Sequence, residues 1–326
     1  MRRDAVVSVA LDQRHASFET EAPLPPQDEE RSYLPFSVIL ILRSAVRRVS
    51  KDACRLCQRS LSVLLLLALC LAPAIAQAVE LAGKLVQGGM VLGTTVPGAT
   101  VALDGRAVPV SPEGRFVFGF GRDASEAVLA LTLPDGTREV RRLAIEERSY
   151  DIQRVDGVPQ NTVTPDPQEL ARIKREADAV RTLRAVASTE NFFSQPMIWP
   201  ATGPISGVYG SQRILNGEPR APHMGVDIAA PAGSPIVAAA SGVVRMAEML
   251  FLTGNTILID HGYGLETSYA HLSRLDVKPG QRVRQGEQIG LLGATGRVTG
   301  PHLHWGMEWF EVRLDPQLVV GPMPPQ

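Results

Sequence analysis

The chain has 326 residues, with 33 Lys and Arg against 34 Asp and Glu, 44% hydrophobic residues and 5% aromatic residues. This is a globular composition with room for about two domains, and it excludes a disordered tail protein. The formal net charge of -1 and the lack of a dense Lys/Arg cluster argue against nucleic acid as a partner, because such binding needs concentrated positive charge. The single long apolar run, residues 61–76, is too short and too near the N-terminus for a polytopic membrane protein.

Residues 1–78 are predicted to be a leader that contains a signal peptide. Basic residues precede the apolar run 61–76, and small residues precede two candidate cleavage points, after Ala76 and after Ala78; this is the pattern of a secretory signal. Cleavage would leave a mature chain without a membrane span, exported to the periplasm or cell envelope. An uncleaved N-terminal anchor is the alternative.

Residues 1–45 are unusual upstream of a signal peptide, because they are mixed in charge and interrupted by prolines. One hypothesis is that translation starts at a Val or Leu such as Val46 or Val49, so that residues 1–45 are not made. The basic stretch would then stand at the N-terminus, where secretion requires it.

All three cysteines, Cys54, Cys57 and Cys70, lie within the predicted leader. The Cys54-x-x-Cys57 spacing is therefore interpreted as coincidence and not as a redox or zinc motif. Lipidation at Cys70 is disfavoured by the bulky Leu69 before it. An exported chain without cysteine must bind any metal through His and carboxylate side chains.

Residues 79–158 are predicted to form an accessory domain. Short alternating apolar runs are separated by turn signals such as Asp104-Gly105 and Pro134-Asp-Gly136, which favours a small antiparallel sandwich. The region has no cluster of titratable side chains that looks catalytic, so we interpret it as a spacer or accessory module.

Residues 159–191 are predicted to be a linker with one helix. Apolar residues at positions 170, 173, 177, 180 and 183 follow helical spacing. Asp166 is the expected N-cap, with Pro167 at the first helical position. The Lys/Arg face of the predicted helix is interpreted as solvated.

Residues 192–326 are predicted to be a second, mainly antiparallel β domain, because Val/Ile-rich runs alternate with Gly-containing turns. Five of the six histidines of the chain lie here: His223, His261, His271, His302 and His304. Coincidence is the simpler explanation, but a metal site is the alternative, because imidazole is a common zinc ligand.

The spacing of these residues favours the metal site. On a strand, His302 and His304 project from the same face with Cα atoms about 6.6 Å apart, while Leu303 points to the core. His223 and Asp227 would be about 13 Å apart on a straight strand, too far to bind one ion. A bend is required between them, and Gly225 is the expected place.

Five motifs together resemble the lysostaphin/LytM-type zinc endopeptidases. In chain order they are Arg213-x-x-x-Gly217, His223-Met-Gly-Val-Asp227, His261 to His271-Leu, Gly286-x-x-Ile289-Gly, and Thr295-Gly-Arg-Val-Thr-Gly-Pro-His-Leu-His304. The resemblance covers about residues 192–316. Residues 80–154 show a weaker resemblance to the immunoglobulin-like N-terminal domain of exported members. The expected fold is therefore mainly β: an immunoglobulin-like sandwich, a connecting helix and a LytM-type antiparallel sheet.

The resemblance implies that His223, Asp227 and His304 bind Zn²⁺ and that His271 and His302 are the two catalytic histidines. Three protein ligands leave one position open, as in catalytic zinc sites. His261 is expected to make a supporting hydrogen bond. Asn216 is expected to be a turn residue, with blocking of the open zinc position in a latent form as the alternative.

The implied function is a secreted zinc metalloendopeptidase that hydrolyses peptide bonds in peptidoglycan stem or cross-bridge peptides. The alternative is a catalytically silent regulator that binds peptidoglycan or activates a cell-wall amidase. A general protein-degrading zinc protease is a third, weaker option. The complete His/Asp/His set and both accessory histidines favour activity. The bond cleaved, the division of roles between His271 and His302, autoinhibition and the oligomeric state are left open by the sequence.

Overall fold

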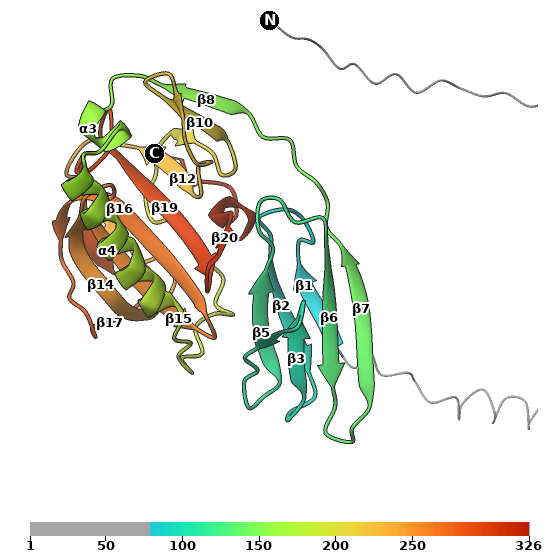
Figure 1. Ribbon diagram of the computed structural model, residues 1–326. Helices are drawn as coiled ribbons and strands as arrows, with labels where there is room; N and C mark the ends of the chain where they lie inside the picture. Colours follow the sequence, from blue (N-terminus) through green and yellow to red (C-terminus); the bar gives the residue numbers. More distant parts are fainter. Residues whose placement is uncertain (1–78, 326) are drawn as a thin grey trace, which may run out of the picture. The chain divides into compact units, whose positions relative to one another are not determined.

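A computed structural model of the protein describes residues 79–325. The predicted leader, with its signal peptide, cysteines and alternative start, lies outside the described residues. The described chain is mainly β, as the sequence predicts, with antiparallel sheets and few helices (Figure 1). None of the helices in the described part is long and apolar enough to cross a membrane.

The N-terminal strands form two antiparallel sheets, ordered β1-β2-β5 and β4-β3-β6-β7. Alternate residues of β6 are buried, so one face of each strand supplies the core, as in a sandwich. Asp104 and Gly105 have φ of 49° and 78° in the tight turn between β3 and β4, which explains the Asp-Gly pair there. The strands are β1 Val79–Gly83, β2 Met90–Thr95, β3 Thr100–Leu103, β4 Arg106–Val108, β5 Arg115–Gly119, β6 Glu126–Thr132 and β7 Arg138–Ala144.

The last strand within residues 79–158, β8, does not pair with the strands of the sandwich. β8 (Ile152–Val155) runs parallel to β10 (Gln212–Leu215), which also pairs with β11 (Glu218–Pro219). Residues 152–155 therefore belong to a three-stranded sheet whose other two strands, β10 and β11, come from the C-terminal region. The pairing joins strands about 60 residues apart, and local patterns carry no signal for such contacts.

Two helices lie in the linker. The short α3 (Gln160–Val163) is followed by α4 (Pro167–Arg184), where the sequence predicts a helix. The Asp166 side chain accepts hydrogen bonds from the Gln168 and Glu169 N–H groups, while Glu169 accepts one from the Asp166 N–H. This capping box and Pro167 fix the start of α4.

The C-terminal region forms one ten-stranded sheet, whose main order is β17-β14-β15-β16-β19-β12-β9. β13 pairs with β18, β18 with β16, and β20 with β19. β19 lies between β16 and β12, so side chains from three strands can meet above it. The strands are β9 Ile205–Gly207, β12 Val226–Ala229, β13 Pro235–Val237, β14 Gly242–Leu250, β15 Gly254–Gly262, β16 Leu265–Leu275, β17 Arg282–Val283, β18 Gln288–Leu292, β19 His302–Trp309 and β20 Val312–Leu314, followed by the 3₁₀ turn η1 Pro316–Leu318.

Candidate metal centre

The centre is built on the pairing of β12 with β19. Asp227 lies directly opposite His304 in this antiparallel pair, and Ala229 lies opposite His302. Directly opposed residues share one face of a sheet, with Cβ atoms about 5 Å apart. Leu303 is fully buried between the two histidines, as the alternation predicts. The register therefore places one carboxylate and two imidazoles on the same face.

His223 reaches the same place through a bend before β12. Residues 220–224 are irregular, a bend falls at Gly225, and the strand begins at Val226. This confirms the predicted bend. A Cβ on Gly225 would lie 2.7 Å from both His304 Cε1 and the Trp305 carbonyl oxygen, so only glycine lets the bend approach β19 this closely.

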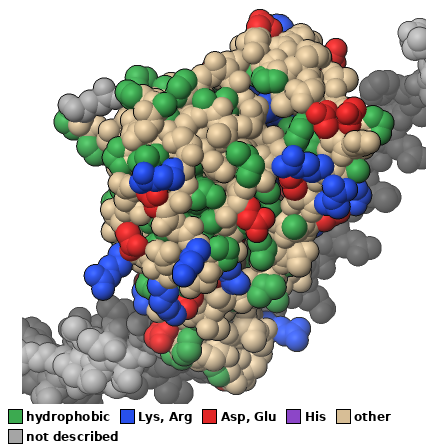
Figure 2. All heavy atoms as spheres, turned by 90° about the vertical axis from the view of Figure 1, so that its left-hand side faces the viewer, with side chains coloured by type: hydrophobic (Ala, Val, Ile, Leu, Met, Phe, Trp, Pro, Cys, Tyr) green, Lys and Arg blue, Asp and Glu red, His purple; other side chains and the backbone are tan. Residues whose placement is uncertain are grey.

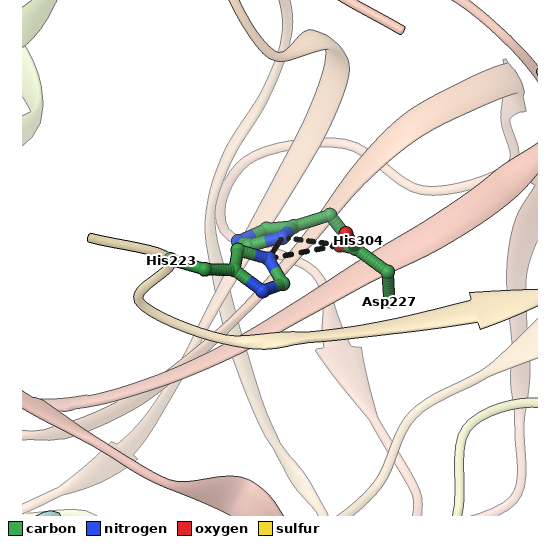
Figure 3. Close-up of side chains that lie close together, drawn as sticks. All are labelled: His223, Asp227 and His304. Atoms are coloured by element: carbon green, nitrogen blue, oxygen red, sulfur yellow. Dashed lines mark hydrogen bonds and ion pairs between the residues drawn. The ribbon is translucent and has the colours of Figure 1, made fainter. Parts of the chain in front are cut away.

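The ligand atoms of three residues converge (Figure 3). His223 Nε2 lies 3.0 Å from Asp227 Oδ1 and 2.9 Å from His304 Nδ1, and His304 Nδ1 lies 2.8 Å from Asp227 Oδ1. His223 and Asp227 are buried, while His304 is partly exposed. The cluster is therefore closed on one side and accessible on the other.

The protonation states of His223 and Asp227 suit the binding of a cation. The His223 Nδ1–H group donates to the Val208 carbonyl at 3.1 Å, so Nε2 is the nitrogen left to act as a ligand. Burial lowers the pKa of His223 to about 4, which keeps this imidazole neutral. Burial acts to raise the pKa of Asp227, but its close contacts with the ring nitrogens of His223 and His304 outweigh burial and hold that pKa well below its usual range. Two imidazoles and one carboxylate of this kind fit Zn²⁺.

Arg213 supports the carboxylate from the other side. Its Nη2 donates to Asp227 Oδ2 at 2.6 Å, so one carboxylate oxygen is held while Oδ1 faces the two histidines. A cationic donor on the outer oxygen fixes the orientation of a ligand. Arg213 belongs to a motif seen in the sequence, but the residue pattern did not indicate this contact.

His302 and His271 lie beside the cluster. His302 Nε2 is 3.8 Å from Asp227 Oδ1, and the His271 and His302 ring centroids are 4.8 Å apart. His302 Nδ1–H donates to the Gly300 carbonyl at 2.9 Å, and His271 Nδ1–H donates to the Thr295 carbonyl at 2.8 Å. Both rings therefore keep Nε2 free as a proton acceptor. Burial, followed by the nearby His304 and His302, lowers the pKa of His271 to about 3.

The backbone at His271 is unusual. Regular alternation along β16 would place His271 on the same face as the buried Tyr269. Its φ of 66° lies in the left-handed region, which costs a non-glycine residue roughly 1 to 2 kcal/mol. This conformation brings the ring beside His302. Such strain is found at functional sites.

His261 and Asn216 lie outside the cluster. His261 is fully buried, and its two ring nitrogens lie 2.8 Å from the Ser241 carbonyl and the Thr267 hydroxyl. The Asn216 amide donates to the Val158 carbonyl at 3.0 Å and to Gln160 Oε1 at 2.9 Å. Asn216 thus contacts Val158 and Gln160, whereas the metal-capable group found within residues 79–325 consists of His223, Asp227 and His304.

Residues 221–316 match Peptidase family M23. Peptidoglycan DD-endopeptidase ShyA of Vibrio cholerae is 51% identical over 85 residues, covering 26% of this chain and 20% of that protein. Cell division protein DipM of Caulobacter vibrioides is 35% identical over 161 residues, covering 49% of this chain and 25% of that protein. The chain therefore spans only about a fifth to a quarter of the length of these curated relatives.

One solved structure is similar over most of the chain. It is a putative peptidase M23 from Pseudomonas aeruginosa, 29% identical, with a TM-score of 0.57 over 73% of this chain and 96% of that one. Together, the fold and the match place a peptidase-family domain in this part of the chain, and the residue set adds a cluster able to hold a metal. Residues 221–316, in the C-terminal part of the chain, match a Peptidase M23 domain, and this part is similar to LytM-type peptidoglycan endopeptidases.

Proposed function

We propose that the protein is an exported zinc metalloendopeptidase that hydrolyses peptide bonds in peptidoglycan stem or cross-bridge peptides. The observation that carries the proposal is the convergence of His223, Asp227 and His304, with two further imidazoles beside them. The peptidoglycan substrate is supported by the similarity of this domain to peptidoglycan endopeptidases.

Each residue of the centre is given a role. His223 Nε2, Asp227 Oδ1 and His304 Nδ1 would hold the zinc ion. Zinc bound there would polarise the scissile carbonyl and acidify a water molecule. The free Nε2 of His271 or His302 would accept a proton from the attacking water, and the Nε2–H formed in this way would then donate a hydrogen bond to the developing oxyanion. The carbonyl oxygens of Thr295 and Gly300 hold these two rings in the required tautomer.

Four variants separate zinc ligands from catalytic groups. His304→Ala should lose zinc and activity, because only two ligands remain. His302→Ala and His271→Ala should keep near-stoichiometric zinc and lose about 10²-fold or more in rate, the contribution of one acid/base group. His261→Ala should change zinc content and catalytic rate least, since its ring lies outside the cluster.

The measurements are zinc content by atomic absorption and the rate of hydrolysis of purified cell wall. Loss of zinc in His302→Ala with retention in His304→Ala would reverse the two assignments. Wild-type protein that is fully loaded with zinc yet cleaves no cell wall would instead favour a regulator that binds peptidoglycan or an amidase.

A further inference from the structure

The loop that follows β9, residues 208–211, holds His223 at three points. The Val208 carbonyl accepts a hydrogen bond from the His223 ring. The Gly210 N–H donates to the His223 carbonyl at 2.7 Å, and the His223 N–H donates to the Ser211 carbonyl at 2.8 Å. The side chain is 2% exposed, and no histidine side chain is visible on the face shown in Figure 2. The orientation of this ring therefore depends on the loop and not on solvent.

The accessory domain reaches this loop through Arg122. Arg122 lies in the turn before β6, and its Nε donates to the Gly210 carbonyl at 2.7 Å. A guanidinium donor makes this a charge-assisted hydrogen bond, which is roughly twice as strong as a neutral one. Gly210 thus connects the accessory domain to the metal centre, because its carbonyl accepts from Arg122 while its N–H donates to His223.

Tyr150, between β7 and β8, packs against the same glycine. A Cβ on Gly210 would collide with the Tyr150 ring, and Gly210 has a φ of 86°, so glycine is required both for the turn and for the close contact. The Arg122 guanidinium lies 4.3 Å from the centroid of the Tyr150 ring, within the range of a cation–π contact. Arg122 and Tyr150 therefore hold each other as well as the loop.

Tyr209 fixes the middle of the loop between the two regions. Its hydroxyl donates to the Arg313 carbonyl of β20 at 2.9 Å, and its ring is 1% exposed. A Cβ on Gly88 of the accessory domain would lie 2.7 Å from Tyr209 Cε1, so the accessory domain packs directly on this ring. The loop is held by the accessory domain on one side and by β20 on the other.

We propose that Arg122 and Tyr150 are positioning residues of the metal centre. They fix loop 208–211, whose Val208 carbonyl sets the tautomer of His223, so the accessory domain is a support of the centre and not a spacer. Groups that orient a metal ligand typically change metal affinity by about 10- to 100-fold when they are lost. Arg122 and Tyr150 act through one further contact, so the lower end of this range is expected. The inference rests on the proposed function for the assignment of His223 as a zinc ligand.

The test compares arginines that the accessory domain directs at the C-terminal region. Arg122→Leu removes the donor to Gly210, and Tyr150→Leu is a second variant that removes the ring against the same glycine. The matched control is Arg106→Leu. The Arg106 guanidinium lies 4.3 Å from the centroid of the Phe310 ring, so it also joins the two regions, but Phe310 is not part of the loop.

Three quantities are measured on the full mature chain. Urea denaturation shows that each variant is folded. Zinc affinity is measured by competition with a chromogenic chelator at pH 7. Long-range ¹H–¹⁵N spectra of zinc-free, histidine-labelled protein show which ring nitrogen of His223 carries the proton, and the signal is identified by its absence in His223→Gln.

The two loop variants should bind zinc about tenfold more weakly than wild type and should show a second tautomer of His223. Arg106→Leu should stay within about twofold of wild-type affinity and keep the wild-type ring signals. A loss in Arg122→Leu no larger than in Arg106→Leu would overturn the proposal. Weaker zinc binding with unchanged His223 ring signals would overturn it as well, because the effect would then not pass through this histidine.

The ring signals also separate this proposal from the proposed function. Wild-type protein that binds no zinc would contradict the zinc peptidase. The zinc-free spectra would still decide whether Arg122 orients His223, because they require neither metal nor activity.

Discussion

The loss of zinc affinity on replacing Gly225 can be estimated from the distances around the bend. In Gly225→Ala the new Cβ would lie 2.7 Å from His304 Cε1, 2.8 Å from His304 Nε2 and 2.7 Å from the Trp305 carbonyl oxygen. Ordinary carbon contacts are about 3.5 to 4.0 Å, so the groups must separate by roughly 1 Å. Trp305 lies in β19, which pairs on both sides, so its carbonyl cannot move easily. The bend and His304 must therefore shift.

A shift of roughly 1 Å exceeds what a metal site tolerates. Ligand distances must stay within about 0.2 Å of their ideal values, and functional groups within about 0.5 Å of the productive geometry. We therefore expect zinc affinity to fall by about tenfold or more, equivalent to at least about 1.4 kcal/mol. Stability is a poor readout, because Gly→Ala also restricts the unfolded chain and so offsets part of the loss.

The assay is a competitive zinc titration against a chromogenic chelator at pH 7. The control is Gly121→Ala, where a Cβ would meet nothing within 4 Å. Neither Gly225 nor Gly121 has a positive φ, so backbone strain does not distinguish the two variants. Zinc affinity within about threefold of wild type for Gly225→Ala would refute the reasoning, since the site would then not depend on the close approach at this bend.

Two further predictions concern pH and processing. Burial raises the pKa of Glu266 from 4.5 to about 7, so the folded state binds this proton more tightly than the unfolded state does. The zinc-free protein should therefore lose stability as the pH rises from 4.5 to 7, by at most about 3 kcal/mol. Glu266→Gln should flatten the dependence of unfolding free energy on pH in a urea-denaturation series, and an unchanged slope would contradict the assignment. If the proposed signal peptide is cleaved, the mature protein should begin at Gln77 or Val79 and contain no thiol. Intact-mass spectrometry checks this prediction, and residues 1–60 on the mature chain would rule out the signal peptide.

Features set by local chemistry could be predicted from the sequence. The start of α4 depends on Asp166, Pro167 and Glu169, which are neighbours in the chain. The shared face of His302 and His304 follows from the two-residue period of a strand. The bend before Asp227 follows from the distance that a straight strand would impose. Each of these needs only a few consecutive residues and a known backbone geometry.

Features set by long-range contacts could not be predicted in this way. The parallel pairing of β8 with β10 joins distant segments and takes residues 152–155 away from the sandwich. The position of α4 over the sheet depends on contacts such as Arg184 with Glu308. The spacing of apolar residues predicts that α4 has an inner face, but it does not say what that face covers.

The orientation of the histidines shows why the residue types alone were insufficient. His223, His271 and His302 each direct Nδ1–H to a main-chain carbonyl, those of Val208, Thr295 and Gly300 respectively. The acceptor is independent of side-chain identity, so no residue pattern records it. It nevertheless leaves Nε2 as the free nitrogen on all three rings, whereas His304 turns Nδ1 toward Asp227. Backbone carbonyls thus fix the chemistry of three imidazoles, and the path of the loops after β9 and β18 matters as much to the site as the histidines themselves.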